Sequence, residues 1–325
     1  MRRREVIRLI GVSVAWSMAA RAEQPALPRQ IGYLGMPSLP EQVERVEALR
    51  KGLRELGYIE GANITIHYRW AENRYEHLPA LANELVRLNP DVILAHGTPG
   101  TRAAMGATTS IPIVVIVAGD LLSPGLVPSL ARPGGNLTGQ TFFFPEICAK
   151  RIELIKEAVP LVSRVAALVN PNNQAYPMAL TAMERTAQAL QLELFALEVR
   201  TREELIGAFA GMTEKQAHAA VVVDDAFLIA SAELIGDLAL KHLIPVIGEK
   251  SHTRGKAFMS YGVDLNDFWF RSATLVDRIL KGAKPGDLPI QQATKFELVI
   301  NLNVAKALGV TIPPTLLARA DEVIE

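Results

Sequence analysis

The stretch VILAHGTPG, residues 92–100, holds the pattern that decides the fold of this 325-residue chain. The apolar residues 92–95 predict a short buried strand, and the small residues 97–100 predict a turn into a helix that runs through Thr108. A second apolar run, 111–117, predicts the next buried strand. A strand, a turn at its carboxyl end, a helix and a further strand form a βαβ unit, the building block of a parallel sheet.

The same unit repeats on both sides of this stretch. Apolar strand patterns occur at residues 31–35, 63–70, 165–169, 192–199, 219–223 and 244–247. Helical spacing of apolar residues occurs at 41–56, 77–88, 150–159, 179–190, 203–212, 231–242 and 268–280. Near-continuous Val, Ile and Leu strands between amphipathic helices are typical of parallel sheets that are covered on both faces.

These repeats fall into two runs and predict an α/β protein with two doubly wound, Rossmann-like lobes, each of about four strands. We expect residues 136–145 to carry the chain from lobe 1 to lobe 2 and residues 257–261 to carry it back, which makes a multi-strand hinge. One large sheet or two independent domains are the alternatives. The expected boundaries are a signal peptide at 1–22, a linker at 23–29, lobe 1 at 30–140 and 262–290, and lobe 2 at 141–261 and 291–325.

The N-terminus has the pattern of an export signal. Arginines at 2–4 precede an apolar run at 9–20, and Ala20-Arg21-Ala22 supplies the small residues that signal peptidase reads. The paired arginines are similar to a twin-arginine signal, so export through either pathway stays open. No cysteine stands near the cleavage site, so no lipid anchor is expected there. The pattern predicts a periplasmic protein; an ordinary N-terminal helix is the alternative.

Composition excludes several classes of function. Lys and Arg together number 34, as do Asp and Glu, and this balance argues against a nucleic acid as partner. The single cysteine, Cys148, rules out an intramolecular disulfide and a four-cysteine zinc site. The sequence has no His-Glu-x-x-His, Gly-x-Ser-x-Gly or phosphate-loop motif. We therefore expect no enzymatic activity, no metal and no cofactor.

Ligands of doubly wound sheets bind at the carboxyl ends of the strands, and this rule selects candidate ligand-binding residues. The candidates are Ser38, Thr98 and Asp120 on lobe 1, and Asn170, Tyr176, Asp224, Asp225, Glu249 and Tyr261 on lobe 2.

Two of these positions suggest how an amino-acid-like ligand would be held. Thr98 precedes a helix, whose N-terminal N–H groups attract anions, so we expect it to hold a carboxylate. Asp225 or Glu249 is expected to pair with the amine, because a buried ammonium needs a carboxylate partner. Capping a helix is the alternative for Thr98 and for one of the two aspartates, and hinge packing is the alternative for Tyr261.

Several stretches are similar to motifs of one protein family. They are SLARPGGN at 129–136 with Thr138-Gly139 after it, MSYG at 259–262, KGAKP at 281–285, TKFELVINL at 294–302, and the tail from Ile312-Pro313-Pro314 to Glu325. Over nearly its whole length the chain resembles the tryptophan/aromatic-amino-acid-type family of ABC transporter substrate-binding proteins. Members often have Gly-Asp-Pro-Val where this chain has Gly119-Asp120-Leu121-Leu122.

The resemblance implies a type I periplasmic-binding fold. It implies two lobes that close on one small organic solute, amino-acid-like or aromatic, and that deliver it to an ABC permease in the inner membrane. The expected partners are this solute and the permease, and the expected state is a monomer. There are two alternatives to this function. The protein could be a periplasmic sensor that presents its ligand to a receptor, or it could be a two-lobed α/β enzyme.

Overall fold

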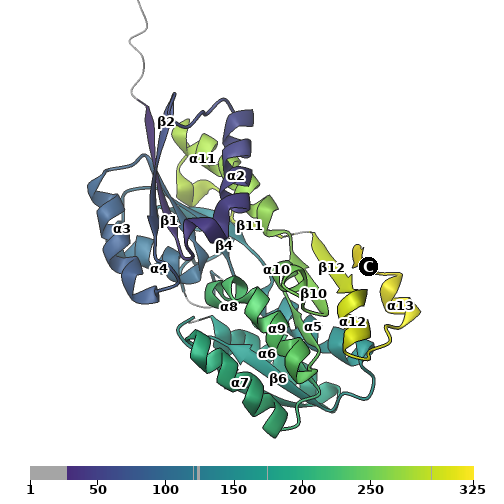
Figure 1. The fold of residues 1–325 in the computed structure, drawn as a ribbon. Coiled ribbons are helices and arrows are strands. Elements are labelled where there is room, and N and C mark those ends of the chain that lie inside the picture. The colour runs from purple at the N-terminus through teal and green to yellow at the C-terminus, as the bar shows by residue number, and fades with distance from the viewer. Residues whose placement is uncertain (1–27, 120, 123–124, 174, 294) are drawn as a thin grey trace, which may run out of the picture.

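The computed structural model describes residues 28–119, 121–122, 125–173, 175–293 and 295–325, so the predicted signal peptide lies outside the described residues. Two sheets, each with its own helices, form two lobes (Figure 1). In the described ranges, no helix is both long enough and apolar enough to cross a membrane.

The first sheet has six strands in the order β11-β5-β4-β3-β1-β2, and all of its pairings are parallel. Its strands are β1 (Arg29–Gly35), β2 (Ile64–Trp70), β3 (Val92–His96), β4 (Ile113–Ala118), β5 (Leu137–Thr141) and β11 (Gln291–Gln292). Its helices are α2 (Leu39–Glu55), η1 (Tyr75–His77), α3 (Leu78–Arg87), α4 (Gly97–Ala107), α11 (Leu265–Leu280) and η2 (Pro285–Asp287). Together they form lobe 1.

Alternation along the strands of lobe 1 explains why both faces are covered. Val92 and Leu94 of β3 share one apolar cluster with side chains of α2 and α11. Ile93 and Ala95 point to the opposite face and share a cluster with side chains of α3 and α4. Successive side chains of a strand point to opposite faces, so an uninterrupted apolar run supplies both cores at once.

The second sheet has seven strands in the order β13-β12-β10-β9-β8-β6-β7, and β12 runs antiparallel to β10. Its strands are β6 (Arg164–Val169), β7 (Glu193–Glu198), β8 (Ala219–Val222), β9 (Val246–Gly248), β10 (Met259–Val263), β12 (Phe296–Asn301) and β13 (Glu322–Ile324). Its helices are α5 (Phe144–Ala158), α6 (Tyr176–Ala189), α7 (Arg202–Glu214), α8 (Ala226–Ala230), α9 (Ala232–His242), α10 (Lys250–Arg254), α12 (Leu302–Ala307) and α13 (Pro314–Leu317). Together they form lobe 2.

The chain passes between the lobes after β5, after β10 and after β11, which confirms the predicted fold class of two doubly wound lobes with a multi-strand connection. Each sheet has more strands than the expected number of about four, because the crossing segments themselves pair with the sheets. The return to lobe 1 follows β10, which ends at Val263, rather than running through 257–261. α11 packs against α2 in lobe 1.

The strand β5 lies within residues 136–145, which are predicted to carry the chain from lobe 1 to lobe 2 but show no apolar strand pattern. Its polar side chains are buried and bonded inside the protein: the Nε2 amide of Gln140 donates to the carbonyl of Phe268 at 2.7 Å. Gly139 has φ +150°, and a Cβ there would lie 2.3 Å from the carbonyl oxygen of Val115. Only glycine therefore fits at this position. The strand carries polar residues because lobe 1 supplies them with partners.

Candidate functional site

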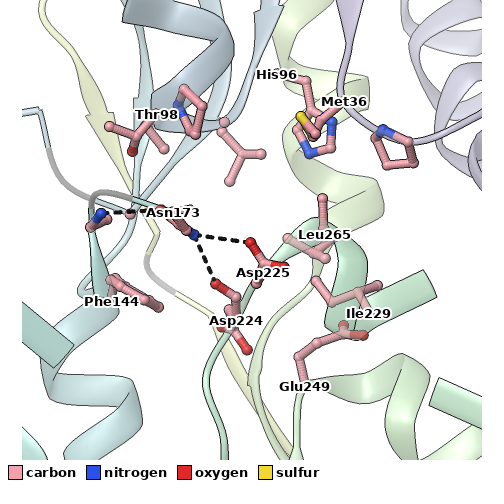
Figure 2. A pocket seen from close by; sticks show the side chains of 18 of the residues that line it. Met36, His96, Thr98, Phe144, Asn173, Asp224, Asp225, Ile229, Glu249 and Leu265 are labelled. Atoms are coloured by element: carbon pink, nitrogen blue, oxygen red, sulfur yellow. Dashed lines mark hydrogen bonds between the residues drawn. The ribbon is translucent and has the colours of Figure 1, made fainter. Parts of the chain in front are cut away.

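A cavity of about 290 Å³ lies between the two lobes, at the carboxyl ends of both sheets (Figure 2). Lobe 1 lines it with Met36, Gln42, Arg45, Tyr75, His96 and Thr98, among others. Lobe 2 lines it with Phe144, Asn173, Asp224, Asp225, Ile229, Glu249 and Ser251, among others. This is the position at which doubly wound sheets bind small ligands.

The structure brings four of the candidate residues to this cavity: Thr98, Asp224, Asp225 and Glu249. Asp120 lies outside the described residues. The remaining candidates, Ser38, Asn170, Tyr176 and Tyr261, are not among the cavity-lining residues.

Three of the residues away from the cavity support it from behind or belong to the core. Asn170 is buried and donates its side-chain amide to Oδ1 of Asp225 at 3.0 Å. Tyr176 begins α6 and packs against the main apolar cluster. Tyr261 stacks on Phe296, with ring centroids 6.2 Å apart. Ser38, in the turn after β1, is half-buried.

Asp224 is held by an arginine from behind the cavity. Arg151 of α5 is fully buried and donates from Nη1 and Nη2 to the two carboxylate oxygens of Asp224, at 2.6 and 3.1 Å. The same guanidinium donates from Nε to the carbonyl of Tyr261 and from Nη1 to the carbonyl of Val222. The charge of Asp224 is therefore balanced inside lobe 2. Because its two oxygens already pair with Arg151, this carboxylate would attract a cationic ligand only weakly.

Asp225 caps a helix and also contacts the other lobe. It is buried, and its Oδ1 accepts from the backbone N–H groups of Phe227 and Leu228 at the start of α8. Its Oδ2 accepts from the hydroxyl of Tyr75, which comes from η1 of lobe 1. Burial raises the pKa of Asp225 above its ordinary value, against the effect of these hydrogen bonds. The carboxylate is close to saturated by donors of the chain itself.

Glu249 is the carboxylate of the cavity with the most unused capacity. It follows β9, is buried, and caps α10 by accepting from the backbone N–H of Ser251 on Oε1 at 2.9 Å. His252 lies 3.7 Å from the same oxygen. From the described part of the chain no hydrogen bond reaches Oε2 of Glu249, so this oxygen can accept from a ligand.

On the facing wall, Thr98 stands in the first turn of α4, two residues after the N-cap residue His96. The side chain of His96 makes no capping hydrogen bond, so the first N–H groups of this helix are not satisfied by a cap. These groups and the Thr98 hydroxyl form a neutral, anion-attracting surface opposite the acids of lobe 2 (Figure 2).

Side-chain contacts also join the two lobes directly. Besides the bond from Tyr75 to Asp225, Nη1 of Arg254 in α10 lies 3.1 Å from Oε2 of Glu44 in α2. Arg254 and Glu44 are exposed, so this pair contributes little by itself. The partly buried hydrogen bond from Tyr75 to Asp225 is the more specific of these contacts.

Sequence reasoning missed several lining residues: Gln42, Arg45, Tyr75, His96 and Asn173. Tyr75 follows β2, so the strand-end rule would have found it if the turn after β2 had been included. Asn173 belongs to the same turn as the candidate Asn170. The conformation of this turn decides which of the two side chains lines the cavity. Gln42 and Arg45 lie on α2, and no local signal separates them from an ordinary polar helix face.

The buried imidazole of His96 leads to a prediction about acid stability. Burial, together with the charge of Arg45, lowers the pKa of His96 to about 3 from an ordinary value of 6.5. Below pH 6.5 the imidazole is therefore protonated in the unfolded chain but stays neutral in the folded chain. The free energy of unfolding is then highest above pH 6.5 and decreases as the pH falls below it. Burial lowers the pKa of His252 as well and acts in the same direction.

Between about pH 7.5 and about pH 5, wild-type protein should lose about 2 kcal/mol more unfolding free energy than His96→Gln. Denaturant unfolding of both proteins at the two pH values measures this difference. His218→Gln, at an exposed histidine, is the matched control and should follow wild type. Parallel losses in wild type and His96→Gln would contradict the prediction.

A family model described as ABC transporter substrate binding protein matches residues 34–324. The match covers both lobes and every cavity-lining residue named above. The chain belongs to the ABC transporter substrate-binding protein family. The resemblance drawn from the sequence motifs is thereby confirmed, and so is the function it implied: the protein captures a small organic solute between its lobes for ABC transport. The family and its structural neighbours are solute-binding proteins and not enzymes.

Relatives of this substrate-binding protein share most of its length. A tyrosine-binding protein of Clostridioides difficile (strain R20291) is 26% identical over 281 residues, which are 86% of this chain and 81% of the relative. The structure of an ABC domain in complex with L-Trp from Streptococcus pneumonia has a TM-score of 0.85 at 25% identity and covers 91% of this chain and 100% of its own. A conserved domain protein from Vibrio cholerae has the same TM-score at 29% identity, over 91% of this chain and 99% of its own.

Proposed function

We propose that this substrate-binding protein takes an aromatic amino acid as its solute. The observation that carries the proposal is the division of charge across the cavity, with buried carboxylates on lobe 2 facing the neutral, anion-attracting start of α4 on lobe 1. A zwitterion matches this arrangement. Apolar side chains such as Phe142, Phe144 and Leu265 supply surface for a ring. A relative that is a tyrosine-binding protein and a neighbour in complex with L-Trp support the same class of ligand.

In this proposal the α-carboxylate lies against Thr98 and the N-terminus of α4, and the ammonium group lies against Glu249. Asp225 accepts from several donors of the chain and Asp224 is paired with Arg151, so Glu249 is the best remaining partner for a cation. A charge-assisted hydrogen bond to an ammonium group is about twice as strong as a neutral one.

A ligand screen by thermal unfolding tests the proposal. L-Tyr, L-Trp and L-Phe should each be compared with aliphatic, acidic and basic amino acids on the protein from residue 23 onward. A ligand present at about 100 times its Kd stabilises by about 2.7 kcal/mol, which is a shift of several degrees for a protein of this size. Stabilisation by branched aliphatic amino acids or by sugars, without any by aromatic amino acids, would refute it.

We further propose that the protein works in the periplasm as a monomer and delivers its solute to a permease of the inner membrane. Family membership supports an extracytoplasmic place of action. The division into lobe 1 at about 30–140 and 262–290 and lobe 2 at about 141–261 and 291–325 is part of this proposal, and the ends of β5, β10 and β11 favour crossings just after residues 141, 263 and 292.

Export predicts removal of the N-terminus. We expect cleavage between Ala22 and Glu23, because Ala20 and Ala22 fit the small-residue pattern of signal peptidase sites. Mass spectrometry of the protein released from the periplasm should find Glu23 as the first residue. Recovery of an exported protein that still begins at Met1 would contradict the prediction.

Ligand binding should favour the closed arrangement of the lobes. A ligand that contacts Thr98 and Glu249 together gains both contacts only when the lobes are closed, as is also true of the bond from Tyr75 to Asp225. Small-angle scattering should therefore show a smaller radius of gyration with ligand than without it. Tyr75→Phe should enlarge the ligand-free particle, and an identical profile for the free and bound states of this variant would contradict closure.

A further inference from the structure

Two buried side chains of lobe 1 that line the cavity each have one polar atom without a hydrogen-bond partner among the described residues. Gln42 of α2 is 1% exposed and His96, at the end of β3, is 9% exposed. Neither Oε1 of Gln42 nor Nδ1 of His96 has a hydrogen-bond partner in the part of the chain that the structure describes. Both residues line the cavity. Buried polar atoms in folded proteins are nearly always paired, and for these two, at the wall of the cavity, a bound ligand can supply the missing partner.

Arg45 lines the cavity beside them. Its guanidinium lies 5.4 Å from the centroid of the Trp269 ring, and within the described ranges it forms no ion pair with a carboxylate. Gln42, Arg45 and His96 are called the polar wall below. The wall combines a charged donor with an amide, which can donate and accept, and with an imidazole that burial keeps neutral.

Building on the proposed function, we propose that the polar wall binds a hydroxyl group on the ring of the ligand. The site would then select a hydroxylated aromatic amino acid, such as L-tyrosine, over an unsubstituted one.

A phenol hydroxyl matches the wall better than the other groups an aromatic amino acid can bring. Its proton can be donated to Oε1 of Gln42 or to the imidazole of His96, while its oxygen accepts from the guanidinium of Arg45. An indole N–H can only donate and leaves Arg45 without a new partner. An unsubstituted ring leaves all three groups unpaired. Met36 lies beside His96 in Figure 2, so apolar surface for the ring adjoins the wall.

Calorimetric titration with L-Tyr, L-Phe and L-Trp tests the proposal, with wild type and two variants. Wild type should bind L-Tyr about 100-fold more tightly than L-Phe, because a site built around a hydroxyl leaves buried groups unpaired when the hydroxyl is absent. Gln42→Met and Arg45→Met should each lower the affinity for L-Tyr by roughly tenfold or more and leave the affinity for L-Phe nearly unchanged. Arg45 is half-buried, so Arg45→Met keeps the test usable if Gln42→Met does not fold.

Matched controls use the same substitutions at exposed positions. Gln188→Met on α6 and Arg87→Met on α3 should bind all three ligands as wild type does. Equal affinity of wild type for L-Tyr and L-Phe would overturn the polar wall as a hydroxyl subsite. The same holds if the variants lower the affinity for both ligands equally. A preference for L-Trp that Gln42→Met removes and Arg45→Met does not would also overturn it, in favour of an indole N–H. Failure of all three ligands to bind would instead refute the proposed function.

Discussion

Arg151→Met should lower the free energy of unfolding by about 3–5 kcal/mol, the cost of leaving one partner of a buried ion pair uncompensated. Arg151 is fully buried, and its guanidinium bonds both oxygens of Asp224 as well as the backbone carbonyls of Val222 and Tyr261. It thereby ties α5 to β8 and β10, next to the point where the chain leaves lobe 2. Methionine has a similar length and no donor. Denaturant unfolding at neutral pH measures the change.

A double variant separates the charge from the loss of packing. In Arg151→Met with Asp224→Asn the unpaired carboxylate is gone, so a substantial part of the stability should return, because replacing both partners costs much less than removing one. Arg87→Met, at an exposed arginine of α3, should stay within about 0.5 kcal/mol of wild type. A loss of less than about 1 kcal/mol for Arg151→Met would show that the ion pair is not a main support of lobe 2.

Glu249→Gln should weaken binding of the amino acid ligand by roughly a hundredfold, or about 2.8 kcal/mol at ~1.4 kcal/mol for each factor of ten. The proposed partner of the ammonium group is the carboxylate of Glu249, which is 3% exposed and has an unused oxygen. Glutamine keeps an oxygen that can cap α10 through the N–H of Ser251, so the fold should be preserved. Calorimetry gives the affinity, and thermal unfolding without ligand checks the fold.

Changing the ligand makes this test specific. A ligand analogue without the amine should bind wild type weakly and should lose little further affinity in Glu249→Gln, because the group that pairs with Glu249 is already absent. Thr98→Ala should be milder, since a neutral hydrogen bond contributes only about 1 kcal/mol. If Glu249→Gln binds the amino acid as tightly as wild type does, the ammonium group does not pair with Glu249.

Much of the fold could be read from local patterns. The apolar run at residues 92–95 forms β3, and the turn at 97–100 becomes the first turn of α4. Such runs are informative because a strand of a parallel sheet needs apolar side chains on both faces. β5 was missed for the opposite reason. The amide of its buried Gln140 donates to the carbonyl of Phe268, 128 residues later in the chain, and no local pattern predicts that partner.

Some residues of the site could likewise be predicted from local sequence, and others only from the tertiary structure. Thr98, Asp225 and Glu249 each lie within three residues of the end of a strand, so the position of the strand end is enough to select them. The choice between the two aspartates required Arg151, whose side chain reaches Asp224 from α5. Tyr75 meets Asp225 from the other lobe, and the polar wall is assembled from α2 and β3.

The sequence by itself determined the class of fold, the order of its elements and the strand ends at which a solute can bind. These features follow from short-range physics, namely the period of apolar residues, the helix caps and the alternation of strand and helix. Only the tertiary structure decided which carboxylate remains available, because the charge of Asp224 is cancelled by an arginine 73 residues away and Asp225 is occupied by donors from both lobes. Pairing over such distances depends on how the lobes pack, and the residues next to a side chain in the sequence do not predict its partner.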